Sequence, residues 1–481
     1  MATLNAESLP PQLSAVVAGN IDGRANNVRY RQRQFHSLQN TILQHADGLK
    51  SAIAQDSGHT TEEVETEVCL ALGEIRSHYS SLDFEKSIEA EYHVANGQDN
   101  LAQRRGVGIV YIIPSGHTVF FSTIAAVAAA LAAGNCIIIE VPQTTSRVTS
   151  FLRRFLPQAL DSDTFAISET RPGPEFLANT LVINQRSTET LGPTLDLASP
   201  NNLRTVGIVD RTADVQAAAT DLVRARFAFN GRSPYAPDVV LVNQFCMQPF
   251  IELVIKHAAK HLGANGRGSQ EKTGHLKQDS VLNDVQSYKS VNTIISGTGW
   301  SIAQVSERSS PLLQAKVSER LLLLHPVSSL DDAINLCNLS GTHTATYTFA
   351  SPAAAKYVSE SIDAHTAWIN HVPFEMLVGP AIPANFPINP STRYTRESFE
   401  VSRPQVVVKS ANTILTMKVL DKEASRLKYI QEVFSPLPAV RQRPGHSIGF
   451  FEQGIITGGL LGLTSLITFV SGVGYWMYRL R

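Results

Sequence analysis

Three consecutive stretches decide the fold class of this chain: GVGIVYIIP (106–114), TVFFSTIAAVAAALAAG (118–134) and CIIIEV (136–141). The first and third are short apolar runs rich in β-branched residues, which are typical of strands buried on both faces. The middle stretch is Ala-rich and apolar nearly all round, and Gly134-Asn135 stops it, as expected of a buried helix. Strand, helix and strand in about 35 residues predict a βαβ unit with a right-handed crossover.

The same rhythm continues along the chain. Residues 28–95 are predicted to be helical, and in the part 62–78 the polar side is assigned to Glu62, Glu63, Glu65 and Glu67. Further helices are expected at 146–160, 212–229, 329–338 and 352–363. Further strands are expected at LVIN (181–184), TVGIV (205–209), VVLV (239–242), LLLL (321–324), TATYTF (344–349) and TAWIN (366–370). This order predicts an α/β fold with two doubly wound lobes.

Composition excludes several classes of protein. Hydrophobic residues make up 43% of the 481 residues and charged residues 17%, so a full core can be buried. The formal charge is 41 minus 42, or −1, and there is no polybasic block, which argues against a nucleic-acid partner. The four cysteines form no Cys-x-x-Cys pair and have no histidine at zinc-ligand spacing. We therefore expect no disulfide framework, no metal site and a reducing compartment.

The C-terminal region predicts a membrane helix. Residues 454–478 contain no charge, and as a helix they would span about 37 Å, enough for a hydrocarbon core of about 30 Å. Arginines flank the run, and Tyr475, Trp476 and Tyr478 lie at its far end, where aromatic rings favour an interface. Because Met1–Asn20 does not resemble a signal peptide, we expect a tail anchor after a linker at 435–453, with the body in the cytosol at the endoplasmic reticulum or another organelle. The alternative is a buried core helix.

Five segments, in this order, resemble the aldehyde dehydrogenase family: LAAGNCIIIE (131–140), VDRTADVQAAA (209–219), FNGRSPYAPDVVLV (229–242), HPVSSLDDAINLCN (325–338) and AWIN (367–370). The resemblance covers roughly residues 28–420, and the short chain with its membrane helix resembles the microsomal fatty-aldehyde branch. It implies a cofactor-type lobe over 1–205 with a return segment near 371–415, a catalytic-type lobe over 206–370, and a homodimer.

The chemistry of that family implies specific residues, which this chain replaces. A cysteine thiolate attacks the aldehyde, an amide holds the oxyanion and a glutamate activates water. The nucleophile position is Pro234, the general-base position is Asp196 and the oxyanion position is Gly116. Proline carries no thiol and no backbone N–H. The neighbours Ser233 and His117 are open either to a chemical role or to ordinary roles as polar loop residues, and Asp196 is equally open to being a solvated or capping residue.

The positions that bind NAD or NADP in the family are also replaced. The lysine that binds the adenosine ribose falls at Glu140, and the glutamate near the third strand of the second lobe falls at Leu322. The glycine-rich phosphate turn falls at Gln185, Arg186, Ser187 and Thr190, so both glycines are lost. A carboxylate at position 140 can accept from ribose hydroxyls but repels phosphate. Arg186 can bind an anion, although a surface arginine is the ordinary role.

The sequence therefore supports two main hypotheses about function. The first is a membrane-anchored aldehyde dehydrogenase-like protein with impaired or absent catalysis, which acts as a scaffold, a dimerisation partner or a binder of a lipophilic aldehyde or related ligand. The second is an active NAD(P)-dependent enzyme that oxidises a long-chain or other lipophilic aldehyde to its acid, since fold alone does not decide activity. A purely structural interaction protein without a pocket is a third possibility.

Overall fold

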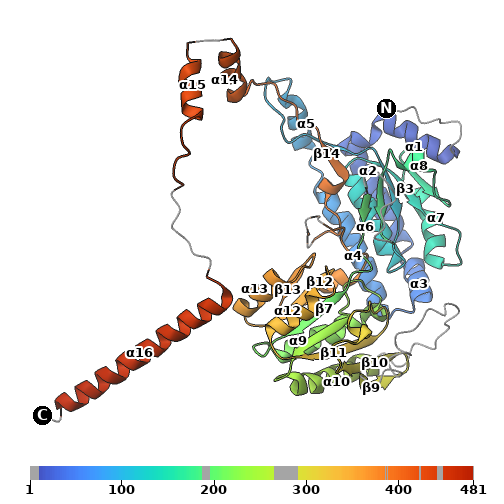
Figure 1. Ribbon diagram of the computed structural model, residues 1–481. Helices are drawn as coiled ribbons and strands as arrows, with labels where there is room; N and C mark the ends of the chain where they lie inside the picture. Colours follow the sequence, from blue (N-terminus) through green and yellow to red (C-terminus); the bar gives the residue numbers. More distant parts are fainter. Residues whose placement is uncertain are drawn as a thin grey trace. The chain divides into compact units, whose positions relative to one another are not determined.

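The computed structural model describes residues 10–186, 196–264, 291–384, 386, 388–389, 391–421, 424–440 and 448–479. By its internal contacts the chain divides into two compact units, Met1–Val408 and Lys409–Arg481. The first unit contains both β-sheets of the body, and the second is helical (Figure 1).

Helices open the first unit, in agreement with the prediction for 28–95. Their bounds are α1 (Pro11–Asp22), α2 (Val28–Gln44), α3 (Ala46–Ser57), α4 (Thr61–Ser80) and α5 (Phe84–His93). The assignment of Glu67 to the polar side of α4 is wrong, because Glu67 is 1% exposed. It follows Val64 by three residues and precedes Ala71 by four, so helical spacing places it on the buried side.

The first sheet has five parallel strands in the order β4-β3-β2-β5-β6. The bounds are β2 (Ile109–Ile113), β3 (Cys136–Glu140), β4 (Phe165–Ser168), β5 (Leu181–Asn184) and β6 (Asp196–Ala198). Alternate residues of β2 and β3 pack in different clusters, one with α1 and the short α8 (Pro174–Leu177), the other with α6 (Val119–Ala132) and α7 (Arg147–Ala159). Helices therefore cover both faces of the sheet, as predicted (Figure 1).

The turn between α6 and β3 depends on Gly134 and Asn135. Gly134 has a φ of 81°, and a Cβ there would lie 2.9 Å from the carbonyl oxygen of Ala25, so only glycine fits. The Asn135 amide donates to the carbonyl oxygens of Ala130 and Phe399, and its oxygen accepts from Gly108 N. The turn thus ties the first βαβ unit to a segment more than 260 residues later.

The second sheet has seven strands in the order β13-β12-β7-β8-β11-β10-β9. The bounds are β7 (Thr205–Val209), β8 (Val239–Asn243), β9 (Val291–Gly297), β10 (Trp300–Val305), β11 (Leu321–Val327), β12 (Ala345–Phe349) and β13 (Ala367–Ile369). Only β9, at the edge, is antiparallel to its neighbour. The covering helices are α9 (Val215–Phe227) and α10 (Met247–Ala264) on one face and α12 (Leu330–Asn338) and α13 (Pro352–Ser361) on the other.

A two-stranded antiparallel ribbon joins β1 (Arg104–Gly106) to β14 (Glu400–Ser402). The second unit then follows, with helices α14 (Ala411–Leu420), α15 (Arg426–Val433) and α16 (Phe450–Arg479). Within α16, residues Glu452–Val473 are long and apolar enough to cross a membrane, and no other helix among the described residues meets that test. This candidate span overlaps the predicted range 454–478.

Candidate functional site

The loop that carries the predicted nucleophile position runs from the end of α9 to β8. It begins with a short helical turn, η3 (Ala228–Gly231), and reaches β8 at Val239. Pro234 lies buried in this loop. Its carbonyl oxygen accepts hydrogen bonds of 2.9 Å from the Thr205 hydroxyl and of 2.9 Å from the Lys316 ammonium group. Pro234 therefore offers a ring without a thiol, and its carbonyl is already bound within the protein.

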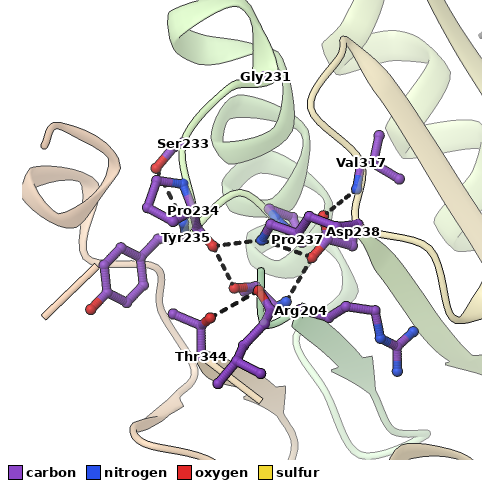
Figure 2. Close-up of polar contacts among 12 residues, drawn as sticks. Arg204, Gly231, Ser233, Pro234, Tyr235, Pro237, Asp238, Val317 and Thr344 are labelled. Carbon is purple, nitrogen blue, oxygen red and sulfur yellow. Dashed lines mark hydrogen bonds and ion pairs between the residues drawn. The ribbon is translucent and has the colours of Figure 1, made fainter. Parts of the chain in front are cut away.

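A buried charge network holds this loop. Asp238 accepts from Thr205 N at 2.7 Å, Val317 N at 2.9 Å and Lys316 Nζ at 3.0 Å. Arg226, fully buried, lies 3.6 Å from Asp238 and also donates to the carbonyl oxygens of Gly231, Val317 and Glu319. Figure 2 shows Asp238 to the side of Pro234, in contact with Val317. Burial lowers the pKa of Lys316, while the neighbouring carboxylate of Asp238 opposes that shift.

The residues on either side of Pro234 also have structural roles. Ser233 is 1% exposed, and its hydroxyl accepts from Tyr235 N at 3.2 Å. The Tyr235 ring points away from Asp238 (Figure 2), and its hydroxyl accepts from Ile382 N at 3.0 Å. No base among the described residues forms a hydrogen bond that would activate Ser233, so the hydroxyl serves the turn.

A polar cavity of about 520 Å³ brings three of the predicted positions together: Gly116, Glu140 and Arg186. We call it the polar cavity. Its other lining residues come mainly from α3, the loop before α6 and the start of α7. Pro234, Asp196, Gln185 and Leu322 are not among the residues that line it. Gly116 is exposed with open space around its Cα, so no side-chain donor stands at the oxyanion position.

Glu140 is tied into a network of its own. Its carboxylate accepts from the Tyr111 hydroxyl at 2.9 Å and from Arg171 Nε and Nη2 at 3.0 and 3.2 Å, and Arg186 lies 3.7 Å away. Burial works to raise the pKa of Glu140, but the bonds from Arg171 and Tyr111 outweigh it and hold that pKa below its usual value. Glu140 is therefore an ionised carboxylate whose two oxygens are both bound within the protein.

Gln185 and Leu322 belong to the core rather than to a ligand site. The Gln185 amide is fully buried, donating to Ser122 O and the Tyr394 hydroxyl and accepting from Ser115 N, each at 2.9 Å. Leu322 lies in β11 at 0% exposure. These two positions are therefore unable to contact a cofactor in this arrangement.

The start of α7, at the rim of the polar cavity, already holds an anion from the chain itself. The Asp56 carboxylate accepts from Arg147 N at 3.0 Å, Val148 N at 2.8 Å and the Ser146 hydroxyl at 2.7 Å. Together with the bound Glu140 and the buried Gln185, this leaves the described residues a poor fit for a dinucleotide. Ser187 and Thr190 lie outside the described residues.

Asp196, the predicted general-base position, is the first residue of β6 and pairs in register with Val182 of β5. Asp196 is partly exposed. It lines neither the polar cavity nor a second cavity beside α4 and α9 that is described below. Pro234, Asp196 and Gly116 thus do not line one common cavity among those described here.

His117, which the sequence left open to a chemical role, lines the polar cavity together with His59 and Glu67, which the sequence did not single out as site residues. Glu67 Oε1 accepts from Phe121 N at 3.3 Å, whereas Oε2 is buried without a hydrogen-bond partner. Burial raises the pKa of Glu67 to about 7 and lowers the pKa of both histidines to about 4. At neutral pH both imidazoles are therefore uncharged.

A second cavity, of about 670 Å³, lies beside α4 and α9, and we call it the apolar cavity. Its apolar lining comes from Leu70, Val223, Ala228, Phe229, Phe374 and Leu377. Polar side chains complete it, including Glu62 and Glu375, which are both exposed. None of the described residues that line it is a cysteine, lysine or serine.

Comparisons with known proteins agree with the fold. The aldehyde dehydrogenase family model matches residues 22–168. Aldehyde dehydrogenase family 3 member B1 of Rattus norvegicus is 24% identical over 365 residues, covering 68% of this chain and 75% of that protein. Family 3 member A2 of Mus musculus is 22% identical over 362 residues, with 68% and 72% covered. The dimeric NADP-preferring aldehyde dehydrogenase of Rattus norvegicus is also 22% identical, with 68% and 78% covered.

The solved structures give the same result. Substrate-bound AldH of Staphylococcus aureus superposes with a TM-score of 0.67 at 17% identity, covering 88% of this chain and 99% of that one. The two sheets and their covering helices therefore define an α/β protein with the aldehyde dehydrogenase fold. The chain carries an aldehyde dehydrogenase family domain and is a homologue of the family 3 enzymes.

Proposed function

We propose that this chain is a membrane-anchored aldehyde dehydrogenase-like protein that lacks dehydrogenase activity and binds an uncharged lipophilic ligand. The observation that carries the proposal is Pro234. It has no nucleophilic group, it is buried, and its carbonyl is bound by Thr205 and Lys316. Without a thiolate the covalent step of the family's reaction has no starting point.

The other positions support the same conclusion. Gly116 offers no side-chain amide to a developing oxyanion, and such a donor contributes roughly 100- to 1,000-fold in rate. Asp196 is one methylene shorter than glutamate, and displacements of that size are costly in catalysis. Glu140, Gln185 and Leu322 are all engaged within the protein.

Ligand binding is supported by the apolar cavity. Its volume of about 670 Å³ lies in the range of small-molecule sites, and aliphatic and aromatic side chains supply much of its lining. A lipophilic aldehyde or alcohol fits that chemistry. The candidate span of α16 supports a place at a membrane, and we propose a tail anchor with the body in the cytosol.

We also propose the lobe boundaries 1–205 with a return segment near 371–415, and 206–370, together with a homodimer. These follow from the family resemblance. Active NAD(P)-dependent oxidation is the second candidate function. The similarity to the dimeric NADP-preferring aldehyde dehydrogenase of Rattus norvegicus favours it.

The test compares full-length wild type with four variants. These are Pro234→Cys alone, Pro234→Cys with Gly116→Asn, the same pair with Asp196→Glu, and all three with Glu140→Lys. We expect wild type and the single variant to form no reduced cofactor from long-chain aldehydes. Residues that act as a unit are not additive, so the combined variants should do better than any single change. Wild-type turnover near 1 s⁻¹ or more, within the ordinary enzyme range, would overturn the proposal.

Cofactor binding is measured separately, by thermal unfolding in millimolar NAD or NADP. A ligand that binds only the native state stabilises it by RT ln(1 + [L]/Kd), so we expect almost no rise in Tm. A rise of several degrees in wild type would favour the enzyme. The third possibility, a structural interaction protein without a pocket, predicts that no long-chain aldehyde or alcohol binds to the purified protein.

A further inference from the structure

The polar and apolar cavities share a wall but no lining residue among those that the structure describes. Phe229 stands in that wall. It lines the apolar cavity, and its ring meets the edges of two histidines that line the polar cavity. Its centroid lies 5.3 Å from that of His59 and 6.2 Å from that of His117, with the ring planes nearly perpendicular in both cases.

Residues that are adjacent in sequence line opposite sides of this wall. His59 lines the polar cavity and Thr60 the apolar one. His117 Nε2 contacts the carbonyl oxygen of Leu377 at 2.8 Å, and Leu377 again lines the apolar cavity. The wall is therefore made from three separate segments, with the Phe229 ring packed among them and only 5% exposed.

The backbone that carries Phe229 is held in an unusual conformation. Phe229, Asn230 and Gly231 have φ values of 49°, 58° and 67°, a left-handed run that phenylalanine and asparagine adopt at a cost. Phe229 N donates to Glu63 Oε1 at 2.7 Å, and the Asn230 amide donates to Ser57 O at 2.9 Å. The Arg226 guanidinium donates a hydrogen bond to the carbonyl oxygen of Gly231. These contacts fix the turn, so they aim the Phe229 ring into the wall.

The charges around the apolar cavity indicate which end of a ligand faces inward. Glu62 and Glu375 are exposed and line it, whereas the Phe229 ring is buried. The Arg224 guanidinium lies over the Phe374 ring, 5.2 Å from its centroid. Among the lining residues three glutamates, Glu62, Glu63 and Glu375, outnumber the one arginine, Arg224, which disfavours a carboxylate head and tolerates an uncharged alcohol or aldehyde. The alkyl end then points toward Phe229.

We propose that Phe229 closes the inner end of the apolar cavity and sets the length limit of the straight-chain alcohol or aldehyde that it admits. This inference rests on the proposed ligand-binding function. It assigns a specificity-determining role to one residue, and it makes the cavity blind rather than continuous with the polar cavity.

The test uses photoaffinity labelling of the full-length protein in membranes. Straight-chain alcohols from butanol to hexadecanol carry a diazirine at the alkyl end, and labelled peptides are identified by mass spectrometry. In wild type we expect labelling of peptides that contain Leu70, Val223 or Phe374, ending above a limiting chain length. Phe229→Ala should move that limit several carbons upward and bring label to the peptides with His59 and His117. Phe229→Trp should move the limit downward.

Two further variants keep the result interpretable. Phe229→Leu preserves an apolar side chain and should give an intermediate limit if Phe229→Ala fails to fold. Phe245→Ala removes a phenylalanine that is 73% exposed, and it should leave the limit unchanged. An unchanged limit in all three Phe229 variants would overturn the inference while leaving ligand binding intact. Absence of competable labelling in every protein would instead overturn the proposed function.

Discussion

Asn135 and Asn370, which lie in segments that resemble the aldehyde dehydrogenase family, both form hydrogen bonds to the backbone. Asn135 joins three backbone groups at the α6–β3 turn. Asn370, in the left-handed conformation at φ 59°, exchanges two hydrogen bonds with the backbone of Ala350. Asp214 caps α9 through Ala217 N. These three polar residues of the family-like segments therefore serve backbone geometry.

Glu67 gives a prediction about pH. Its pKa of about 7 lies above the ordinary value of about 4.3, so the native state holds a proton that the unfolded state releases between these values. The contribution of Glu67 to the free energy of unfolding should therefore fall as pH rises from about 4 to about 7. Glu67→Gln, which resembles the protonated form, should remove that fall and be more stable than wild type at pH 8 by up to roughly 3 kcal/mol.

Urea unfolding of both proteins across this pH range checks the prediction. The pKa values of His59 and His117, about 4, lie below the ordinary value of about 6.5, so these histidines contribute stability that rises with pH over part of this range. That contribution is common to both proteins, and the difference between their two profiles therefore reports Glu67. Glu65→Gln, a change at an exposed glutamate of the same helix, is the matched control. Parallel pH profiles for wild type and Glu67→Gln would contradict the shifted pKa.

Arg226 supports a second residue-scale prediction. Its buried guanidinium lies beside Asp238 and donates to the carbonyl oxygens of Gly231 and Pro237 in the loop before β8. It also donates to the carbonyl oxygens of two residues just before β11, Val317 and Glu319. Breaking a buried pair by removing one partner costs about 3–5 kcal/mol. Arg226→Ala should lower the urea midpoint accordingly, whereas the exposed Arg224→Ala should change it little. Equal small effects would show that the network does not hold the loop.

At the scale of elements, the left-handed turn Phe229–Gly231 is the most constrained part of the site. Gly231 has a φ of 67°, and a Cβ there would lie 2.3 Å from Glu319 O. Gly231→Ala should therefore cost at least about 1–3 kcal/mol of stability. Gly116→Ala is the matched control, because nothing lies within 4 Å of an added Cβ and its φ is ordinary. Thermal unfolding of the pair measures the difference, and equal Tm values would contradict the strain.

The elements also show where sequence patterns suffice. The predicted strands at 181–184 and 205–209 agree with β5 and β7 because each is a short, mostly apolar run that contains several β-branched residues. The prediction did not include β9, an edge strand whose residues are only partly buried and give no clear alternation. It also omitted α10, although Phe250, Val254 and Ala258 recur every four residues.

The candidate site was less predictable for a physical reason. Comparison with the family motif predicted Pro234, Gly116 and Glu140 as replaced positions. A motif does not show, however, which other side chains these residues contact in the folded protein. The engagement of Glu140 by Tyr111 and Arg171 depends on contacts between distant segments. The Phe229 wall depends on a left-handed phenylalanine, which propensity disfavours and only tertiary contacts enforce.

At the scale of the whole molecule, the chain combines a body of known fold with a second unit that carries the candidate span. Unit Met1–Val408 contains both sheets and the two cavities, so its core does not depend on α16. We therefore expect a chain ending at Val440 to fold and to be recovered without detergent. The full chain should stay with membranes after alkaline carbonate extraction.

Two charged variants make the anchor test specific. Leu460→Arg combined with Leu463→Arg places two charges in the span, each costing about 2.5–3.5 kcal/mol near a membrane centre, and should release the protein into the soluble fraction. Leu427→Arg, at an exposed leucine of α15, should not. A glycosylation acceptor appended after Arg481 should be modified only if that end crosses into the lumen. Recovery of the unaltered full chain in the soluble fraction without detergent would exclude the anchor. In that case the ligand of the apolar cavity would have to arrive from water rather than from a bilayer.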